Sequence, residues 1–290
     1  MTGVLLMAHG TPSSLDEMPE YLTRVRGGRP PSPALLGEMR HNYEAIGGRS
    51  PLTDLTFAQG AALHERLGLG VPVSVGMRNW HPFISDAVER LIGTGVRRVI
   101  AIPLAPQFSS TSVAKYYDAV GECLPVNIEM VRVDPYFEHP LLAQAFAERV
   151  LEAAPEPDEE IVFTAHSIPQ RAVADGDPYL AEVAATARGV AARAGIAQYH
   201  QAFQSAGRTP EPWVGPDLGE FLEQRVDAGA RRFLVVPVGF VCDHTEILFD
   251  IDVQAAQRAA DLGATLRRTA SLNTSGTFIA LLESLVRDRL

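Results

Sequence analysis

Short apolar runs alternate along the chain with longer stretches of helical periodicity. The apolar runs predict eight strands, at residues 3–8, 71–76, 98–104, 126–133, 160–165, 199–204, 232–239 and 264–268. The segments between them are rich in Ala, Leu, Glu and Arg and predict helices, among them Asp86–Leu91, Leu141–Ala153, Leu180–Ala194 and Leu218–Val226. Because strands and helices alternate and most strands are apolar throughout, we expect an α/β fold with parallel sheets covered on both faces.

Two motifs occur twice, in the same order. LMAHGTP, which contains His9, matches FTAHSIP, which contains His166. Further along, GVRRVIAIP, which begins at Gly95, matches GARRFLVVP, which begins at Gly229. The repeat predicts a duplicated α/β domain with four strands in each half.

The first half carries an insertion. His9 and Arg97 are 88 residues apart, whereas the matching His166 and Arg231 are 65 apart. The extra residues fall within 21–52, a segment with five arginines and two glutamates. Since ligands bind at the carboxyl ends of strands in open α/β sheets, this basic segment after the first strand predicts an acidic ligand. A surface excursion without a ligand remains an alternative.

Composition and charge exclude several classes. The 290 residues carry a formal net charge of −10, which argues against a general nucleic-acid binder. The longest strongly apolar run, Phe233–Cys242, is too short to cross a membrane, and the N-terminus lacks the basic region of a signal peptide. Two cysteines form neither a disulfide framework nor a four-cysteine cluster. We therefore expect a soluble cytoplasmic protein.

Candidate chemistry begins at two strand ends. His166 closes a buried strand, and His9 holds the equivalent place in the first half. If the two halves face each other, both imidazoles line one cleft. A hydrogen-bonded, purely structural histidine is the alternative at each position.

An acidic segment follows the seventh strand, in GFVCDHTEILFDIDVQ at 239–254. It predicts a helix with Asp243 as N-cap and Glu246 completing a capping box. Glu246, Asp250 and Gln254 recur every four residues and would share one helix face. The helix dipole explains an acidic first turn but explains Asp250 less well. A histidine with a carboxylate suits Fe²⁺, Co²⁺ or Zn²⁺, without the full ligand set of a structural zinc site.

The chain resembles the ferrochelatases, most closely the short bacterial type that acts on coproporphyrin. The resemblance covers nearly the whole chain and rests on MAHGTP, YEAIGGRSPL, PLAPQFSSTSV, AHSIP, GDPY, QSAGRTPEPWVGP and PVGFVCDHTEILFDID, in family order. It implies two Rossmann-like, chelatase-type domains related by duplication, with an active-site cleft between them. Residues 1–147, with a porphyrin-binding insertion at about 21–52, form the first domain and 148–270 the second, which holds the metal site. Residues 271–290 form a helix that packs back on the first domain.

The resemblance also implies roles for individual residues. His166 and Glu246 match the catalytic metal-site pair, which binds Fe²⁺ and accepts the two pyrrole protons. Asp250 matches an acidic relay, whose next position is Gln254 here instead of the expected glutamate. The positions that match porphyrin contacts are His9, Arg26, Asn42, Tyr43, Ser50, Tyr116 and Trp213.

Two of these positions depart from the family pattern. Asn42 stands where an arginine is expected, so one carboxylate contact is either lost or supplied by Arg40 or Arg49. His9 replaces a tyrosine that ligates the iron of the product, a role that imidazole also serves.

The implied activity is insertion of Fe²⁺ into a porphyrin in haem biosynthesis. The basic insertion and the lack of a membrane-associating apolar lip favour coproporphyrin III. Protoporphyrin IX, a cobalt or nickel chelatase acting on another tetrapyrrole, and a non-enzymatic haem carrier remain alternatives. We expect no cofactor beyond the substrate Fe²⁺, no iron–sulfur cluster, no nucleic acid and no integral membrane segment. Transient contact with other haem-pathway enzymes is a further expectation.

Overall fold

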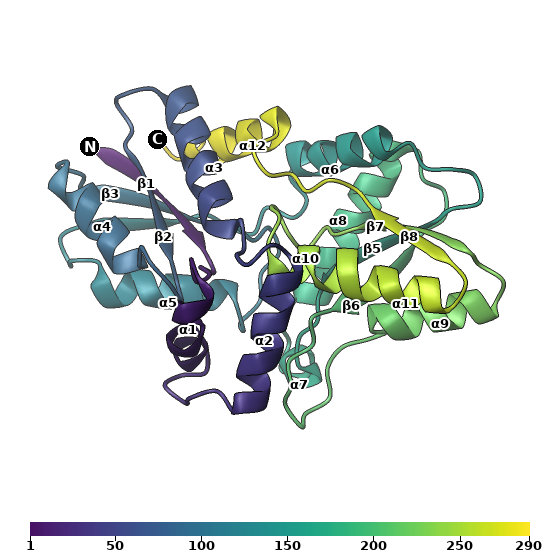
Figure 1. Ribbon diagram of the computed structural model, residues 1–290. Coiled ribbons are helices and arrows are strands. Elements are labelled where there is room, and N and C mark those ends of the chain that lie inside the picture. The colour runs from purple at the N-terminus through teal and green to yellow at the C-terminus, as the bar shows by residue number, and fades with distance from the viewer.

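The computed structural model describes residues 1–290 and contains two parallel four-stranded sheets, one in each half of the chain (Figure 1). The first sheet has the order β2-β1-β3-β4 and the second β6-β5-β7-β8. The strands are β1 (Thr2–Ala8), β2 (Val73–Met77), β3 (Arg98–Pro103), β4 (Glu129–Arg132), β5 (Glu160–His166), β6 (His200–Gln204), β7 (Arg232–Val236) and β8 (Thr265–Arg268). The same order in both sheets confirms the predicted duplicated fold and all eight strands.

The strands alternate with twelve α-helices, several of which pack on the faces of the two sheets. They are α1 (Met18–Val25), α2 (Pro33–Ala45), α3 (Leu52–Leu67), α4 (Ile84–Gly93), α5 (Val113–Cys123), α6 (Pro140–Ala153), α7 (Gln170–Ala174), α8 (Tyr179–Ala194), α9 (Leu218–Asp227), α10 (Thr245–Leu248), α11 (Ala256–Asp261) and α12 (Gly276–Arg287). A short 3₁₀ turn, η1 (Leu15–Glu17), precedes α1, and a π-helix, η2 (Asp250–Ala255), lies between α10 and α11. No helix combines the length and the apolar character needed to cross a membrane.

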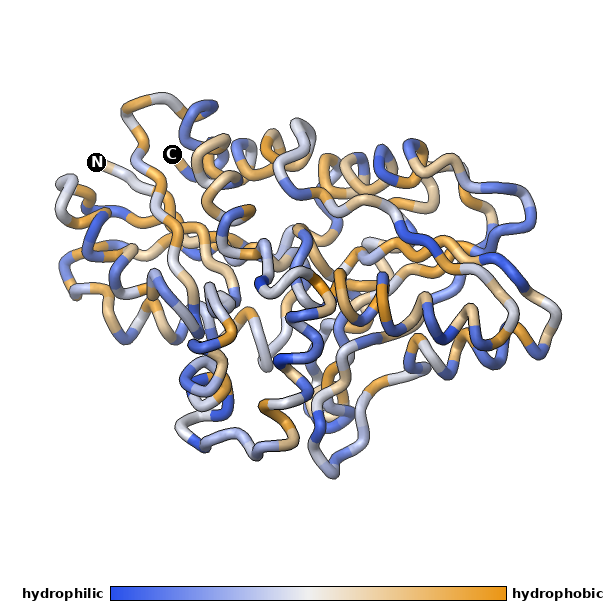
Figure 2. The backbone as a smooth tube through the Cα atoms, in the orientation of Figure 1, coloured by the Kyte–Doolittle hydropathy of each residue, from blue (hydrophilic) through white to orange (hydrophobic).

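The strand β1 shows why its sequence is apolar at every position. Leu5 and Met7 pack in a cluster with α4 and α5, while Leu6 packs in a second cluster with Leu63 of α3. Alternate side chains of a strand point to opposite faces, so a strand covered on both sides needs apolar residues throughout. Figure 2 shows the resulting hydrophobic strands beneath more polar helices.

The last helix, α12, joins the two halves. It contacts both α3 and α6, and its Phe278 and Leu282 are fully buried (Figure 1). These residues belong to a hydrophobic cluster that also contains Leu6 of the first sheet and Phe163 of the second. The expected domain division between residues 147 and 148 falls inside α6, a continuous helix packed against α8. The division predicted there would cut α6 in two.

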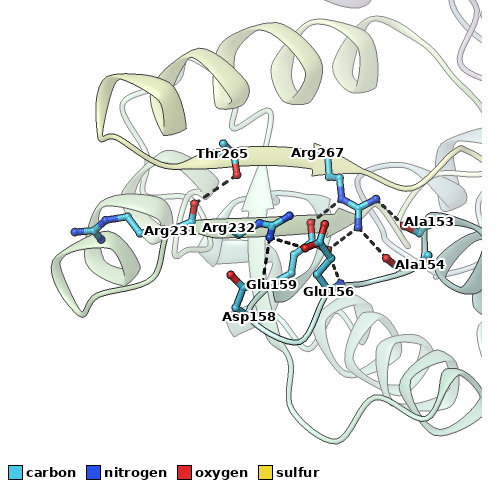
Figure 3. A network of polar contacts seen from close by, with 9 residues as sticks. All are labelled: Ala153, Ala154, Glu156, Asp158, Glu159, Arg231, Arg232, Thr265 and Arg267. Atoms are coloured by element: carbon cyan, nitrogen blue, oxygen red, sulfur yellow. Dashed lines mark hydrogen bonds and ion pairs between the residues drawn. The ribbon is translucent and has the colours of Figure 1, made fainter.

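A charged network closes the amino end of the second sheet (Figure 3). Arg267 of β8 donates to the buried carboxylate of Glu159 at 2.7 and 2.6 Å, and to the carbonyl of Ala153 at 2.6 Å. Arg232 of β7 pairs with Asp158 at 3.3 Å. These contacts tie β8 to the start of β5 and to the end of α6. The carboxyl end of the sheet, away from this network, is where a ligand would bind.

Candidate active site

His166 and Glu246 meet at the carboxyl end of the second sheet. His166 ends β5, an inner strand, and Glu246 lies in α10 after the turn that follows β7. Gly239 makes this approach feasible, since a Cβ there would lie 2.7 Å from the Cβ of Ala165. Nε2 of His166 is 3.6 Å from Oε1 of Glu246, and the two side chains are 35 and 38% exposed. The pair is thus accessible from solvent.

Glu246 has a second imidazole beside it. Nε2 of His244 lies 3.5 Å from Oε2 of Glu246, and Nδ1 of His244 lies 3.0 Å from the carbonyl oxygen of Cys242. His244 is not among the site residues predicted from the sequence. The sequence feature that could have indicated it is its position two residues before Glu246, within the acidic segment 239–254.

The predicted capping box at Asp243 is wrong. α10 begins at Thr245 with His244 as its N-cap residue, and no side chain caps the helix. The Asp243 carboxylate instead accepts hydrogen bonds from Ser271 at 2.7 Å and from Asn273 at 2.8 Å. The Asp243 carboxylate therefore bonds to residues some 30 positions further along the chain and does not cap α10.

The predicted helical face of Glu246, Asp250 and Gln254 is also wrong in its spacing. The α-helical turn of α10 gives way to the π-helix η2, in which the N–H of Gln254 donates to the carbonyl of Phe249, five residues back, at 2.8 Å. A π-helical turn contains an extra residue, so side chains four apart no longer align. Gln254 is exposed, whereas Asp250 is half-buried.

The His166–Glu246 pair carries opposite charges at neutral pH. Burial lowers the pKa of His166, but the Glu246 carboxylate and a backbone hydrogen bond to Ser167 outweigh it, and the pKa rises to about 9. Burial disfavours the charged form of Glu246, yet His166 and His244 hold the pKa of this carboxyl well below its usual range. An imidazolium therefore faces a carboxylate.

Asp250 titrates closer to neutrality than an ordinary aspartate. Burial raises the pKa of its carboxyl, the charge of Glu246 raises it further, and the result is a pKa of about 6. The hydroxyl of Ser205 donates a hydrogen bond to Oδ2 of Asp250. Asp250 therefore exists in both protonation states near neutral pH.

His9 faces the same region from the first half. Gly10 has a φ of 83°, and a Cβ there would lie 2.7 Å from the Cβ of Met77, so the turn after His9 requires glycine. Nδ2 of Asn79 lies 3.1 Å from Nε2 of His9. Burial and then the positive charge of Arg78 lower the pKa of His9 to about 4. His9 is thus neutral where His166 is protonated.

Aromatic side chains of the first half surround this region. Burial raises the pKa of Tyr43 to about 12 and that of Tyr116 to about 12, and the charge of Glu246 acts on both. The guanidinium of Arg78 lies 5.4 Å from the ring centroid of Tyr116. On the opposite side, the rings of Trp213 and His166 are 6.4 Å apart. Of the predicted porphyrin contacts, His9, Tyr43, Tyr116 and Trp213 therefore lie around the His166–Glu246 pair.

The insertion reaches across to the second half through α2. Glu38 of α2 forms a bidentate ion pair with Arg208, and the rings of His41 and Phe249 are 6.2 Å apart. Figure 1 shows α2 beside α10. A helix of the first half thus borders the metal-site loop of the second.

The other predicted contacts make no bond to the pair. Arg26 is exposed at the end of α1, Asn42 is half-buried on α2, and Ser50 is buried beside the start of α3. None of them hydrogen-bonds to His166 or Glu246. Of the two arginines expected to replace the missing contact at Asn42, Arg49 is paired with Asp54, and the buried Nε of Arg40 has no partner.

Comparison with known proteins decides the family, because the ferrochelatase family model matches residues 1–290. The chain belongs to the ferrochelatase family. The Ferrochelatase of Deinococcus radiodurans is 44% identical over 99% of this chain and 95% of that protein. The Coproporphyrin III ferrochelatase of Geobacillus thermodenitrificans is 37% identical over 99% and 96%. The chain is thus a metal chelatase, a ferrochelatase of the lyase class, as the motifs had indicated.

Solved structures agree on the fold. SirB from Bacillus subtilis with Fe³⁺ superposes with a TM-score of 0.63 at 12% identity, covering 99% of this chain and 94% of that one. CbiX, described as the terminal enzyme of sirohaem biosynthesis in denitrifying bacteria, gives 0.57 at 14% identity, with 99% of both chains covered. This ferrochelatase therefore has the chelatase-type fold.

Several side chains of this ferrochelatase were missed from sequence. Burial raises the pKa of Tyr21 and of Tyr179, and the charge of Glu246 acts on both, so they belong to the same region as His244. No group of three or more His, Cys, Asp or Glu side chains is arranged to hold a metal ion. The His166–Glu246 pair supplies two donors, and a cation there would take further ligands from its co-substrate.

Proposed function

We propose that this ferrochelatase inserts Fe²⁺ into coproporphyrin III and yields iron coproporphyrin III. The observation that carries the proposal is the His166–Glu246 pair, 3.6 Å apart and open to solvent, with His9, Tyr43 and Tyr116 on its other side. Insertion exchanges two pyrrole protons for Fe²⁺ without electron transfer. The reaction therefore needs no cofactor beyond its substrates and no iron–sulfur cluster.

His166 and Glu246 hold Fe²⁺ on one face of the macrocycle. Before the cation binds, a proton occupies His166, because its pKa is about 9. Fe²⁺ and this proton compete for the same imidazole nitrogen, so binding of the cation releases the proton. Once this proton has left, the pair carries the negative charge of the ionised Glu246, which attracts the cation.

Asp250 takes up the protons that leave the pyrroles. A general base works best when its pKa lies near the working pH, and the pKa of Asp250 is about 6. Glu246 passes protons on and does not stay protonated at neutral pH, because its pKa lies far below neutrality. Gln254 is exposed and cannot ionise, so the relay ends at Asp250 and passes protons to solvent.

The porphyrin lies between the two halves. Tyr43 and Tyr116 are buried and support the first-half side of the site. The ring of Trp213 lies 6.4 Å from that of His166 and offers a flat surface of the kind that binds planar ligands. His9 is neutral, with a pKa of about 4, so its imidazole is free to ligate iron from the face opposite His166.

The insertion supports coproporphyrin III, which carries four carboxylates where protoporphyrin IX carries two. Arg26 and Arg29 have no carboxylate partner, and Arg40 has a buried Nε without a hydrogen bond. Arginine binds carboxylates with two parallel hydrogen bonds. The Geobacillus relative bears the name Coproporphyrin III ferrochelatase, although other relatives are named only Ferrochelatase.

The test compares both porphyrins with Fe²⁺ under anaerobic conditions, by the change in the Soret band. We expect kcat/KM for coproporphyrin III to exceed that for protoporphyrin IX by about tenfold or more, equivalent to one good charged contact. Equal values, or preference for protoporphyrin IX, would overturn the substrate assignment. Product limited to one equivalent per chain would indicate a carrier, and faster reaction of Co²⁺ with sirohydrochlorin would indicate the other chelatase class.

A matched pair of arginines sharpens the test. Arg26→Ala should reduce the preference for coproporphyrin III, because Arg26 is free to bind a carboxylate. Arg49→Ala should leave it unchanged, because Arg49 is paired with Asp54. Equal effects of the two changes would contradict the proposed role of the insertion.

A further inference from the structure

Asn273 lies in the segment that crosses from β8 to α12, outside the residues considered so far as functional. Its backbone is left-handed, with a φ of 45°, a conformation that asparagine adopts more readily than most residues. Its N–H donates to the carbonyl of Val241 at 3.0 Å. The crossing segment is therefore bonded to the loop that leads into α10.

The amide of Asn273 makes two further bonds with Asp243. Oδ1 of Asn273 accepts from the backbone N–H of Asp243 at 2.9 Å, and Nδ2 donates to Oδ2 of the Asp243 carboxylate at 2.8 Å. The other oxygen of this carboxylate accepts from Ser271 at 2.7 Å and pairs with Arg268 at 3.1 Å. The backbone and the side chain of Asp243 are thus both fixed from one side.

The position of Glu246 depends on this loop. Glu246 follows Asp243 by three residues, and α10 is a four-residue helix without a side-chain cap. So short a helix has little stability of its own and takes its orientation from its attachments. A shift of Asp243 would carry Glu246 away from His166.

Asn273 also reaches the first half. Its carbonyl accepts a hydrogen bond at 2.9 Å from Nε2 of Gln59, a fully buried residue of α3. The same residue therefore links the loop of the metal pair to a helix on the other side of the molecule.

We propose that Asn273 is a positioning residue for metal insertion. It holds the 241–246 loop so that Glu246 faces His166, and its bond to Gln59 links this loop to the first half. The inference rests on the proposed roles of His166 and Glu246.

A charge exchange tests the proposal in the full-length protein. Asn273→Asp places a carboxylate against that of Asp243, whereas the double variant Asp243→Asn/Asn273→Asp restores the bond with donor and acceptor exchanged. We expect Asn273→Asp to lower kcat/KM for Fe²⁺ by about 10- to 100-fold, as for other partners of metal ligands, and the double variant to recover most of the loss. The Kd for coproporphyrin III, from fluorescence quenching, should stay within about twofold of wild type, because Asn273 bonds to Gln59, Val241 and Asp243 and to none of the residues proposed to bind the macrocycle.

Thr277→Ala is the matched control. It removes the hydroxyl that donates to the Glu148 carboxylate, whose two oxygens lie 3.0 and 2.8 Å away, in the neighbouring stretch of chain and without touching the loop. We expect it to keep the wild-type kcat/KM for Fe²⁺. Asn273→Gly is a second probe, since glycine tolerates the left-handed backbone while losing the amide, and it replaces Asn273→Asp if that variant does not fold.

The outcomes separate this inference from the proposed function. A wild-type kcat/KM for Fe²⁺ in Asn273→Gly, or a double variant no better than Asn273→Asp, would overturn the positioning role. Glu246→Gln is assayed beside them. If Glu246→Gln keeps wild-type insertion, the metal-site assignment fails; if it is inactive while Asn273→Gly behaves like Thr277→Ala, only the positioning role fails.

Discussion

At the residue scale, the charge of Glu246 shifts the pKa values of its neighbours. It raises the pKa of His166 and of Asp250 and also acts on Tyr43 and Tyr116 across the site. Two imidazoles, those of His166 and His244, lie within 3.6 Å of its oxygens. A single carboxylate therefore acts on titratable groups of both halves, and most strongly on His166 in the second.

Glu246→Gln removes this charge with little change in shape. We expect insertion to fall by about 100-fold or more, since one positioned proton-transfer or metal group contributes about that much, while porphyrin binding persists. The pKa of His166, followed by NMR, should drop below 9 because burial then dominates. His166→Ala should abolish insertion in the same way. Glu156→Gln, in the distant network of Figure 3, serves as the control.

The pH dependence of cation binding follows from the raised pKa of His166. The imidazole is protonated below about 9, and Fe²⁺ needs it unprotonated, so affinity should rise with pH from 7 towards 9. Calorimetry with Co²⁺ in buffers of different ionisation enthalpy should show release of close to one proton per cation at pH 7. A flat affinity over this range, without proton release, would contradict the assignment.

At the scale of elements, two short helices define the site. The change from α10 to the π-helix η2 turns Gln254 out to solvent and leaves Asp250 within the site. From the first half, α2 contacts the second half through Glu38 and His41. Through these contacts α2 joins the two halves beside α10.

Arg208→Ala tests the contact of α2. The ion pair with Glu38 is 69 and 32% exposed, so we expect a stability change below about 1 kcal/mol. We also expect KM for the porphyrin to rise several-fold, because α2 loses a tether to the second half. Arg171→Ala breaks an ion pair with Glu211 of almost equal exposure, 70 and 32%, within the second half. If the two variants have the same KM, α2 does not act through this contact.

At the scale of the whole molecule, α12 connects the two halves. It contacts α3 and α6 and shares a hydrophobic cluster with both sheets. The last residues of the chain thus stabilise an element from near its beginning.

Phe278→Ala should destabilise both halves together. Phe278 is fully buried, and truncation of such a side chain costs about 3–5 kcal/mol. Urea unfolding followed by circular dichroism should show one transition moved to lower concentration. Phe57→Ala, at a residue of α3 that is 44% exposed, should move it little. Unfolding in two separate steps would show that α12 does not couple the halves.

The apolar pattern by itself determined the eight strands, most helices and the repeated order of elements. This is possible because strand burial and helix periodicity depend on residues that are close together in the sequence. The motifs also identified the family. They placed His166 at a strand end and Glu246 after the next inner strand, which suffices to bring both to one edge of a parallel sheet.

Only the tertiary structure decided how the loop before Glu246 is held. Asp243 hydrogen-bonds to Ser271 and Asn273 instead of capping α10. His244 lies beside Glu246, and the π-helix η2 changes the spacing of the side chains that follow Glu246. It also decided that α6 belongs with α8 and α12. The local sequence determines whether a segment tends to form a helix or a strand. Its hydrogen-bond partners and packing contacts are distant in sequence, and only folding brings those groups together.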